Sequence, residues 1–333
     1  MGKNMKIAVI GATGLVGQKM LQVLEERNLP MDELIVAASE RSIGKKTLFN
    51  GREYTLISVE DVIEKRPDIA IFSAGAEASL RYAPFFAEKG TYVIDNSSAW
   101  RKKESIPLVV PEINANDINV DTHIIANPNC STIGLVMALA PMHRRYGIKR
   151  IVVSTYQSVS GSGIKGLNQL HCEQRGEKAE NPAYPHQIHE NIIPHGGNFL
   201  EDGNTTEEDK LIFETNKILH SNIAVSATVA RVPVYGGHSE SVNVEFSQQY
   251  DLQEIRHILE TTQGVIVSDN PSENLYPTPL MAYDRDEVFV GRLRRDNSID
   301  NGLNFWVVTD NIRKGAATNA VEIAEYLIKK FDF

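Results

Sequence analysis

The sequence predicts an α/β protein in which an N-terminal, doubly wound parallel sheet precedes a second, α+β domain. Its 333 residues exceed a single small domain, so two hydrophobic cores are expected. In about the first 125 residues, short apolar runs alternate with helical segments, as in a parallel sheet covered on both faces. Later runs alternate or are rich in β-branched residues, which is typical of a sheet-rich domain. We place the first domain at residues 1–128, with a C-terminal helix at 314–333 packing back on it, and the second at 129–313.

Five short apolar runs predict the strands of the first domain. Each is followed by glycine or small polar residues, and helical patterns separate them, for example at 79–89. A continuous apolar run bounded in this way is typical of a strand buried on both faces. The runs lie at 6–10, 34–38, 69–72, 92–94 and 124–126.

The second domain has a different pattern. An apolar helical stretch from Cys130 to about Tyr146 opens it. Its strand-like runs lie at 151–159, 223–229, 241–246 and 305–308. Proline-bearing segments at 180–197 and 270–279 are expected to be ordered surface excursions. An amphipathic helix at 315–330 can return to the first domain through an apolar face made of Ala320, Ile323, Ala324 and Leu327.

Composition excludes several classes of function. The net charge of -9 argues against nucleic acid or an anionic membrane as a partner, because both require a positive field. The longest apolar run, at 133–140, is shorter than the roughly 20 residues that span a bilayer. The two cysteines, Cys130 and Cys172, fit a reducing compartment better than a disulfide framework. We therefore expect a cytoplasmic protein with a small-molecule ligand.

A glycine-rich turn follows the first apolar run and precedes a helical pattern. Small residues let backbone N–H groups approach a pyrophosphate at a helix N-terminus, so a G-x-x-G-x-x-G turn in this place predicts a Rossmann-like dinucleotide site. A helix whose glycines only pack on the sheet is the alternative, and the preceding strand disfavours it. The expected cofactor contacts are Gly11, Thr13, Gly14, Leu15, Val16 and Gly17.

The residues after the second apolar run bear on the choice of dinucleotide. An acid here would hold a ribose 2′-hydroxyl, but Ser39, Arg41 and Ser42 surround Glu40 in this chain. Arginine and hydroxyl groups suit a 2′-phosphate, so we expect NADP rather than NAD. A solvated loop arginine is the alternative.

Cys130 is the candidate nucleophile. It follows an Asn-Pro-Asn segment and precedes an apolar helix, whose N-terminal dipole can lower the pKa of the thiol and favour the thiolate. A buried structural cysteine is the alternative, but the polar neighbours Asn129, Ser131 and Thr132 suit oxyanion contacts better. Cys172 lies among charged residues and is expected to be a spectator.

Further motifs follow one another over nearly the whole chain. They occupy 96–101, 127–132, 157 with 160–163, 207–210, 214–217, 231–234, 237–240 and 310–319. Together with the glycine turn, and in this order, they make the chain resemble the aspartate-semialdehyde dehydrogenase family.

The resemblance implies a phosphate-dependent, reversible oxidation of L-aspartate 4-semialdehyde to L-4-aspartyl phosphate, on the pathway to lysine (through diaminopimelate), threonine and methionine. Cys130 would attack the aldehyde, a hydride would leave for NADP, and phosphate would displace the thioester. His238 would take and return protons, because unperturbed imidazole has a pKa of about 6.5. Gln157 would orient the acyl group.

Substrate and cofactor contacts also follow from the resemblance. Arg231 would clamp the substrate carboxylate. Glu208 would meet the ammonium group, although the choice between Glu207 and Glu208 stays open. Phosphate would be held by Arg101, Lys210 and the amide of Asn129. Further cofactor contacts would come from Ser160, Gly161 and Asn319.

The family forms homodimers, sometimes homotetramers, through its second domain, so that domain is expected to be the catalytic and dimerisation domain. Two other functions stay open. N-acetyl-γ-glutamyl-phosphate reductase shares the fold and the cysteine, but its acetylated substrate needs no acid for an ammonium group. A catalytically idle NADP-binding sensor would keep the glycine turn, and the presence of Cys130, Gln157 and His238 together disfavours it.

The histidines near residue 190 do not predict a metal site. His186, His189, Glu190 and His195 could be taken for ligands, because a histidine spacing of three can place side chains on one helical face. Pro185 and Pro194 interrupt any regular helix there. We expect no metal.

Overall fold

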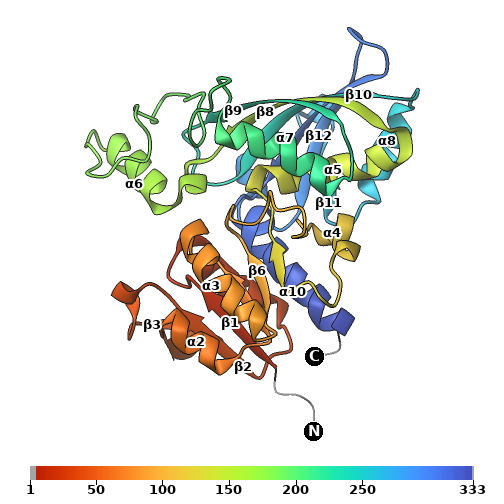
Figure 1. The fold of residues 1–333 in the computed structure, drawn as a ribbon. Helices are drawn as coiled ribbons and strands as arrows, with labels where there is room; N and C mark the ends of the chain where they lie inside the picture. Colours follow the sequence, from red (N-terminus) through yellow and green to blue (C-terminus); the bar gives the residue numbers. More distant parts are fainter. Residues whose placement is uncertain (1–4, 332–333) are drawn as a thin grey trace. The chain divides into compact units, whose positions relative to one another are not determined.

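The computed structural model describes residues 5–331 and divides the chain into two compact units (Figure 1). Unit 1 comprises the residues up to Pro128 together with those from Ala316 onward, and unit 2 comprises Asn129–Gly315. The boundary expected from sequence at 313/314 lies two residues before this second division. Residues 1–4 and 332–333, at the ends of the ranges expected for the first domain, lie outside the described residues.

Unit 1 alternates strands and helices. Its strands are β1 (Lys6–Ile10), β2 (Glu33–Ala37), β3 (Lys46–Phe49), β4 (Arg52–Thr55), β5 (Ile69–Phe72), β6 (Tyr92–Asp95) and β7 (Ile124–Ala126). Its helices are α1 (Leu15–Arg27), α2 (Val59–Lys65), α3 (Ala76–Glu88), α4 (Pro111–Asn114) and α10 (Thr318–Phe331). The main sheet is entirely parallel, in the order β2-β1-β5-β6-β7, and β3 and β4 form a separate hairpin.

Both faces of the unit 1 sheet are buried. On one face, Ile7 and Val9 of β1 join a core that α1 and α10 complete. On the other, Phe72 of β5 packs edge to face against Phe86 of α3, with ring centroids 5.4 Å apart. Figure 1 shows α10, the last segment of the chain, beside the sheet formed by the first residues. A π-helical turn at Arg313–Ala317 precedes α10. The α-helix therefore starts at Thr318, three residues later than the amphipathic pattern at 315–330 predicts.

Unit 2 is built on a six-stranded mixed sheet in the order β11-β12-β13-β10-β8-β9. Its strands are β8 (Ile148–Gln157), β9 (Ala224–Arg231), β10 (His238–Phe246), β11 (Val265–Val267), β12 (Val288–Asp296) and β13 (Gly302–Thr309). Its helices are α5 (Cys130–Tyr146), α6 (Gly163–Gln174), α7 (Thr206–Ile218), α8 (Leu252–Glu260) and α9 (Pro279–Ala282). The two units together confirm the predicted fold class.

The two faces of the unit 2 sheet differ. Helices α5, α7 and α8 cover one face, where alternate residues of β8 and β10 are buried. The opposite face is only half-buried, and Tyr156 contacts Trp306 there, with ring centroids 5.5 Å apart. Within residues 5–331, no helix has both the length and the apolar composition needed to cross a bilayer.

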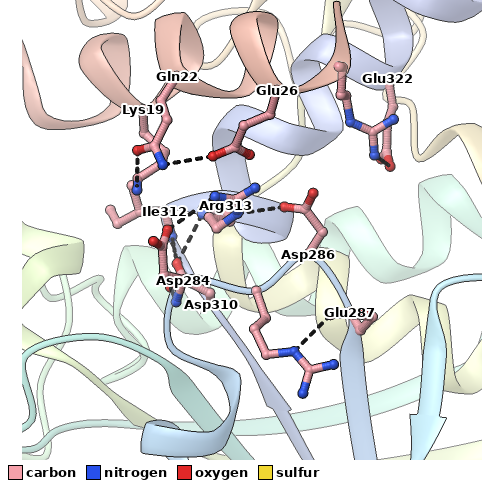
Figure 2. A network of polar contacts seen from close by, with 12 residues as sticks. Lys19, Gln22, Glu26, Asp284, Asp286, Glu287, Asp310, Ile312, Arg313 and Glu322 are labelled. Carbon is pink, nitrogen blue, oxygen red and sulfur yellow. Dashed lines mark hydrogen bonds and ion pairs between the residues drawn. The ribbon is translucent and has the colours of Figure 1, made fainter.

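A polar network holds the turn after β13 (Figure 2). The guanidinium of Arg313 pairs with Asp284 at 3.1 Å and with Asp286 at 2.7 Å, both of which precede β12. Oδ1 of Asp310 accepts the backbone N–H groups of Ile312 and Arg313 at 2.8 and 2.9 Å. These contacts fix the backbone on both sides of residue 311.

Candidate active site

The ends of three strands and one helix meet in unit 2. Strands β8 and β9 are parallel, so their last residues, Gln157 and Arg231, are register partners. Strand β10 is antiparallel to β8, and its first residue, His238, therefore lies at the same edge. Helix α5 begins at Cys130, and Sγ of this residue lies 3.3 Å from Nε2 of His238. The predicted nucleophile and the predicted acid-base residue are thus in contact.

Asn129 holds the start of α5. Its Oδ1 accepts the backbone N–H of Ser131 at 3.0 Å, and its own backbone N–H donates to Glu214 at 2.6 Å. Cys130 is half-buried and lies in the first turn of a 17-residue helix. Because the first N–H groups of a helix lack internal acceptors, they favour a negative charge on the sulfur.

His238 is buried and neutral. Burial and the positive charge of Arg231 lower its pKa to about 3, although Glu207 acts in the opposite direction. The backbone N–H of Ser158 donates to Nδ1 at 3.1 Å, so the ring proton of the neutral imidazole lies on Nε2, which faces Cys130. An Nε2–H group in this position stabilises a thiolate.

Arg231 is a buried guanidinium with an unused donor. It is 6% exposed, and Nη1 donates to the carbonyl oxygen of Ser158 at 3.1 Å. Its Nε group has no hydrogen-bond partner among the described residues. A buried cation is costly unless an anion completes its contacts. The arrangement therefore favours a carboxylate ligand.

Gly161 leaves the space that Arg231 and His238 occupy. A Cβ atom at residue 161 would lie 2.7 Å from Nη1 of Arg231 and 3.2 Å from Cε1 of His238. The hydroxyl of the neighbouring Ser160 lies 3.0 Å from that of Ser158. The two cofactor contacts expected at 160 and 161 thus adjoin the catalytic candidates.

Glu207 places a buried negative charge beside the start of α5. Its Oε1 accepts from Nδ2 of Asn129 and its Oε2 pairs with Nζ of Lys210, both at 2.7 Å. Burial alone would raise the pKa of this carboxyl, but Lys210, Asn129 and Arg231 together lower it to about 2. Glu207 is therefore ionised at neutral pH.

Glu208 has a different role. Its Oε2 accepts the backbone N–H of Thr205 at 2.6 Å and the Thr205 hydroxyl at 2.9 Å, which forms the capping box of α7. Its Oε1 accepts the backbone N–H of Val229 in β9 at 3.0 Å. Both oxygens hold the scaffold. The geometry thus favours Glu207 over Glu208 as the contact for an ammonium group.

Gln157 is fully buried, and its Nε2 donates to the hydroxyl of Ser131 at 2.8 Å. Its Oε1 has no hydrogen-bond partner within the described chain. Ser131 contacts Gln157, and Ser158 contacts His238. The sequence predicts Ser131 only as a polar neighbour of Cys130 suited to oxyanion contacts, and it does not single out Ser158. Ser131 follows Cys130 in sequence and Ser158 follows Gln157. Their contacts, however, are with residues distant in the chain, which a local motif does not reveal.

The glycine turn of unit 1 lies where the strand order reverses. Strand β1 has β2 on one side and β5 on the other, and ligands of such sheets bind at this crevice. A Cβ atom at Gly11 would lie 2.3 Å from the carbonyl oxygen of Ser73, and one at Gly17 would lie 2.1 Å from that of Gly11. Gly14 caps α1 without a side chain, so no N-cap side chain occupies the first N–H groups of the helix, which can receive a phosphate. These residues fit a dinucleotide.

A pocket of about 250 Å³ adjoins the turn, and Gly11, Ser39 and Glu40 are among its lining residues. Arg41 and Ser42 belong to the 3-10 turn Glu40–Ser42 that begins beside this pocket, and Arg41 is exposed.

Two other expected contacts also belong to unit 1. Asn319 is buried in α10, and its Nδ2 donates to the carbonyl oxygen of Val109 at 2.9 Å and to Oδ1 of Asn127 at 2.7 Å. Its Oδ1 is buried and accepts no hydrogen bond from a described residue. Arg101 is also buried, and its Nη2 donates to the carbonyl oxygen of Asn96 at 3.0 Å.

Comparisons with known proteins cover both units. The family model for the semialdehyde dehydrogenase, NAD binding domain matches residues 6–120, and that for the semialdehyde dehydrogenase, dimerisation domain matches residues 139–314. The aspartate-semialdehyde dehydrogenase of Aquifex aeolicus is 53% identical over 335 residues, which cover 98% of each chain. The chain belongs to the aspartate-semialdehyde dehydrogenase family. The resemblance found in the sequence is confirmed.

Solved structures of aspartate-semialdehyde dehydrogenases share this fold. That of enzyme II from Vibrio cholerae, complexed with ASA, is 45% identical with a TM-score of 0.95, and the match covers 99% of this chain and 100% of that one. The enzyme from Candida albicans, with NADP, is 26% identical with a TM-score of 0.78 over 99% and 100% of the chains. Family membership and the glycine turn together indicate an oxidoreductase with a nicotinamide cofactor.

Proposed function

We propose that the chain catalyses the reversible, NADP-dependent and phosphate-dependent oxidation of L-aspartate 4-semialdehyde to L-4-aspartyl phosphate. The contact between Cys130 and His238, at 3.3 Å, carries the proposal because it supplies an activated nucleophile. The Vibrio cholerae enzyme complexed with ASA supports the substrate. The same reaction would place the chain in lysine, threonine and methionine biosynthesis.

The chemistry proceeds through a thioester on Cys130. The thiolate forms a C–S bond with the aldehyde carbon, and the Nε2–H group of His238 stabilises the oxyanion. The oxyanion becomes a hydroxyl by taking a proton from Nε2 of His238. A bound nicotinamide would accept the hydride of this carbon, and the hydroxyl proton would return to Nε2, which leaves a thioester, oriented by Gln157. Phosphate then attacks the carbonyl carbon, the C–S bond breaks, and the thiolate returns.

Recognition uses one cationic group and one anionic group. Arg231 binds the substrate carboxylate with its unused donors, and Glu207, in place of Glu208, binds the ammonium group. Lys210, Asn129 and Arg101 hold phosphate. An ionised acid at this position favours a free amine over the acetylated substrate of N-acetyl-γ-glutamyl-phosphate reductase, which remains the second candidate.

The cofactor binds through the glycine turn, Ser39, Arg41, Ser42, Ser160, Gly161 and Asn319. The hydroxyl groups and the exposed arginine after β2 support NADP over NAD. The half-buried face of the unit 2 sheet supports a homodimer or homotetramer, since this region matches a dimerisation domain. The cytoplasmic location remains a prediction from the cysteine content.

The decisive experiment measures NADP reduction with L-aspartate 4-semialdehyde, with and without phosphate. We expect turnover that requires phosphate. Cys130→Ala should abolish it while leaving NADP affinity within a few-fold, and Cys172→Ala should retain it. A rate that ignores phosphate, or an active Cys130→Ala variant, would contradict the mechanism. Faster turnover of N-acetyl-γ-glutamyl phosphate would support the second candidate.

A further inference from the structure

We propose that Asn311 is a positioning residue for His238 and that it acts through the hydroxyl of Ser158. The inference rests on the proposed function, because it concerns how His238 serves that reaction. Asn311 and Ser158 are 2% and 0% exposed. Neither belongs to the substrate or cofactor contacts described above.

The backbone fixes the orientation of the Asn311 amide. The N–H of Gly237 can only donate, and it lies 3.1 Å from Oδ1, so this atom is the acceptor. The Nδ2 group donates to the hydroxyl of Ser160 at 3.0 Å. Oδ1 also lies 2.9 Å from Oγ of Ser158. The hydroxyl proton of Ser158 therefore points to Asn311.

Ser158 consequently presents both a donor and an acceptor to His238. Its backbone N–H and its Oγ each lie 3.1 Å from Nδ1. Because the hydroxyl proton is directed to Asn311, Oγ turns a lone pair toward the ring. Nδ1 can accept from the backbone or donate to the hydroxyl.

The two proton positions serve different steps. With its proton on Nε2, His238 stabilises the thiolate and the oxyanion. When Nε2 gives its proton to the oxyanion, which becomes the hydroxyl, Nδ1 takes up the proton that the Cys130 thiol released. Nε2 then has the lone pair that takes the hydroxyl proton as the hydride departs. The substrate O–H bond then breaks, an Nε2–H bond forms, and the imidazolium keeps its Nδ1–H bonded to Ser158. Of the charged groups that face the ring, Arg231 opposes this cation and Glu207 favours it, whereas Cys130, bonded to the substrate carbon at this stage, carries no charge.

Loss of Asn311 would leave the Ser158 hydroxyl free to donate to Nδ1. Both donors of Ser158 would then keep the ring proton on Nε2. Cys130 would remain activated, but His238 could no longer act as a base.

The test compares catalysis with thiol reactivity in a Cys172→Ala background. We expect Asn311→Ala and Ser158→Ala to lower kcat by roughly 10²-fold, with little change in KM for the aldehyde, while alkylation of Cys130 by iodoacetamide stays within about twofold. Asn311→Asp keeps the acceptor and should retain most of kcat, but its charge raises the pKa of His238 and moves the acidic limb of the pH profile to higher pH. Asn216→Ala removes an amide that ties the loop at 221–223 to helix α7, and should change neither readout.

Unchanged kcat in Asn311→Ala and Ser158→Ala would overturn the proposal. A parallel loss of kcat and alkylation would also overturn it, since that indicates a merely structural role. Ring ¹⁵N shifts of His238, assigned by their absence in His238→Asn, separate this proposal from the choice of substrate. In Asn311→Ala the His238 ring shifts should move toward the values of the tautomer protonated on Nε2, even if another aldehyde is the substrate. Unchanged shifts would refute the role of Asn311.

Discussion

At the residue scale, the same burial has opposite consequences for the two titratable groups that face each other across the site. His238 loses its charge because burial and Arg231 both disfavour the cation. Glu207 keeps its charge because Lys210 and Asn129 outweigh burial. The site therefore holds a neutral proton carrier and a permanent anion at neutral pH, and both follow from direct neighbours.

Replacing the two adjacent acids should separate binding from scaffolding. Glu207→Gln removes the charge that meets the ammonium group. A hydrogen bond to a charged group contributes about 1.5–3 kcal/mol, so its loss should raise the KM for the semialdehyde roughly 10- to 100-fold. Glu208→Gln retains the capping box, since glutamine also serves at that position, and should leave KM within about twofold of the parent. Steady-state kinetics on the pair decide the matter, and the reverse pattern would restore Glu208 as the contact.

The neutral state of His238 should make unit 2 sensitive to acid. Its folded pKa of about 3 lies below the unfolded value of about 6.5. The unfolded chain thus binds the extra proton, so stability is complete above pH 6.5 and is lost as the pH falls from 6.5 toward 3. At pH 5 the loss is about 2 kcal/mol.

Urea unfolding at pH 7.5 and pH 5 measures this loss. In a Trp100→Phe background, Trp306 of unit 2 is the one remaining tryptophan and reports on that unit. His238→Asn should show an acid-induced loss smaller by about 2 kcal/mol. Equal losses in the two proteins would refute the assignment of His238 as the buried neutral group.

At the element scale, α5 lies against the sheet of unit 2 at a point where no side chain fits. Gly134 is buried in this helix, and a Cβ atom there would lie 2.3 Å from Oγ1 of Thr309 in β13. Oγ1 has no hydrogen-bond partner among the described residues, so it contributes bulk rather than a bond. The close approach also fixes how far the Cys130 end of α5 lies from the strand ends.

Gly134→Ala should therefore destabilise unit 2. Alanine favours a helix by about 1 kcal/mol over glycine, but overpacking costs about 1–3 kcal/mol, so we expect a net loss. Thr309→Ala removes the obstructing Oγ1 atom and should restore stability to the Gly134→Ala variant, with a coupling energy of about 0.5–3 kcal/mol between the two substitutions. Thermal unfolding of the two single variants and the double variant provides the cycle, and additive effects would show that the contact is not tight.

The elements predicted from sequence are those with a local signature. Strands β1, β5 and β7 have the bounds of their apolar runs, and α5 begins at Cys130 as predicted. The hairpin β3–β4 lacks such a signature, since its residues are largely exposed, and strand β12 has only a short apolar run, Val288–Val290, before a half rich in arginine. Likewise, the family motifs single out Cys130 and His238. The link from His238 to Asn311 depends on contacts across 80 and 153 residues, which no local pattern encodes.

At the scale of the whole molecule, unit 1 is built from both ends of the chain. Helix α10 supplies buried residues to the core around β1, and Arg27 of α1 pairs with Glu322 and Glu325 of α10 at 2.7 and 2.9 Å. These ion pairs are half-buried at the edge of that core, and the apolar face of α10 fills the core itself. Without that face, one side of the parallel sheet would be exposed to water.

Ile323→Ala should thus weaken unit 1, far in sequence from its glycine turn. Ile323 is fully buried, and truncation to alanine costs about 2–5 kcal/mol. Lys329→Ala, at an exposed position of the same helix, should cost less than about 0.5 kcal/mol. Trp100 fluorescence in a Trp306→Phe background follows unit 1, and equal melting temperatures for the two variants would show that α10 adds nothing to that core.

The placement of α10 has a consequence during synthesis. The 187 residues of 129–315 are translated between the two parts of unit 1, which takes roughly 10 to 40 s at ribosomal speeds of about 5–20 residues per second. Through that interval the sheet of unit 1 lacks the helix that covers one of its faces, whereas unit 2 is complete as soon as the interval ends. Helix α10 must therefore leave the ribosome before unit 1 is complete and can bind a dinucleotide. Cys130, the candidate nucleophile, is by then already in place in unit 2.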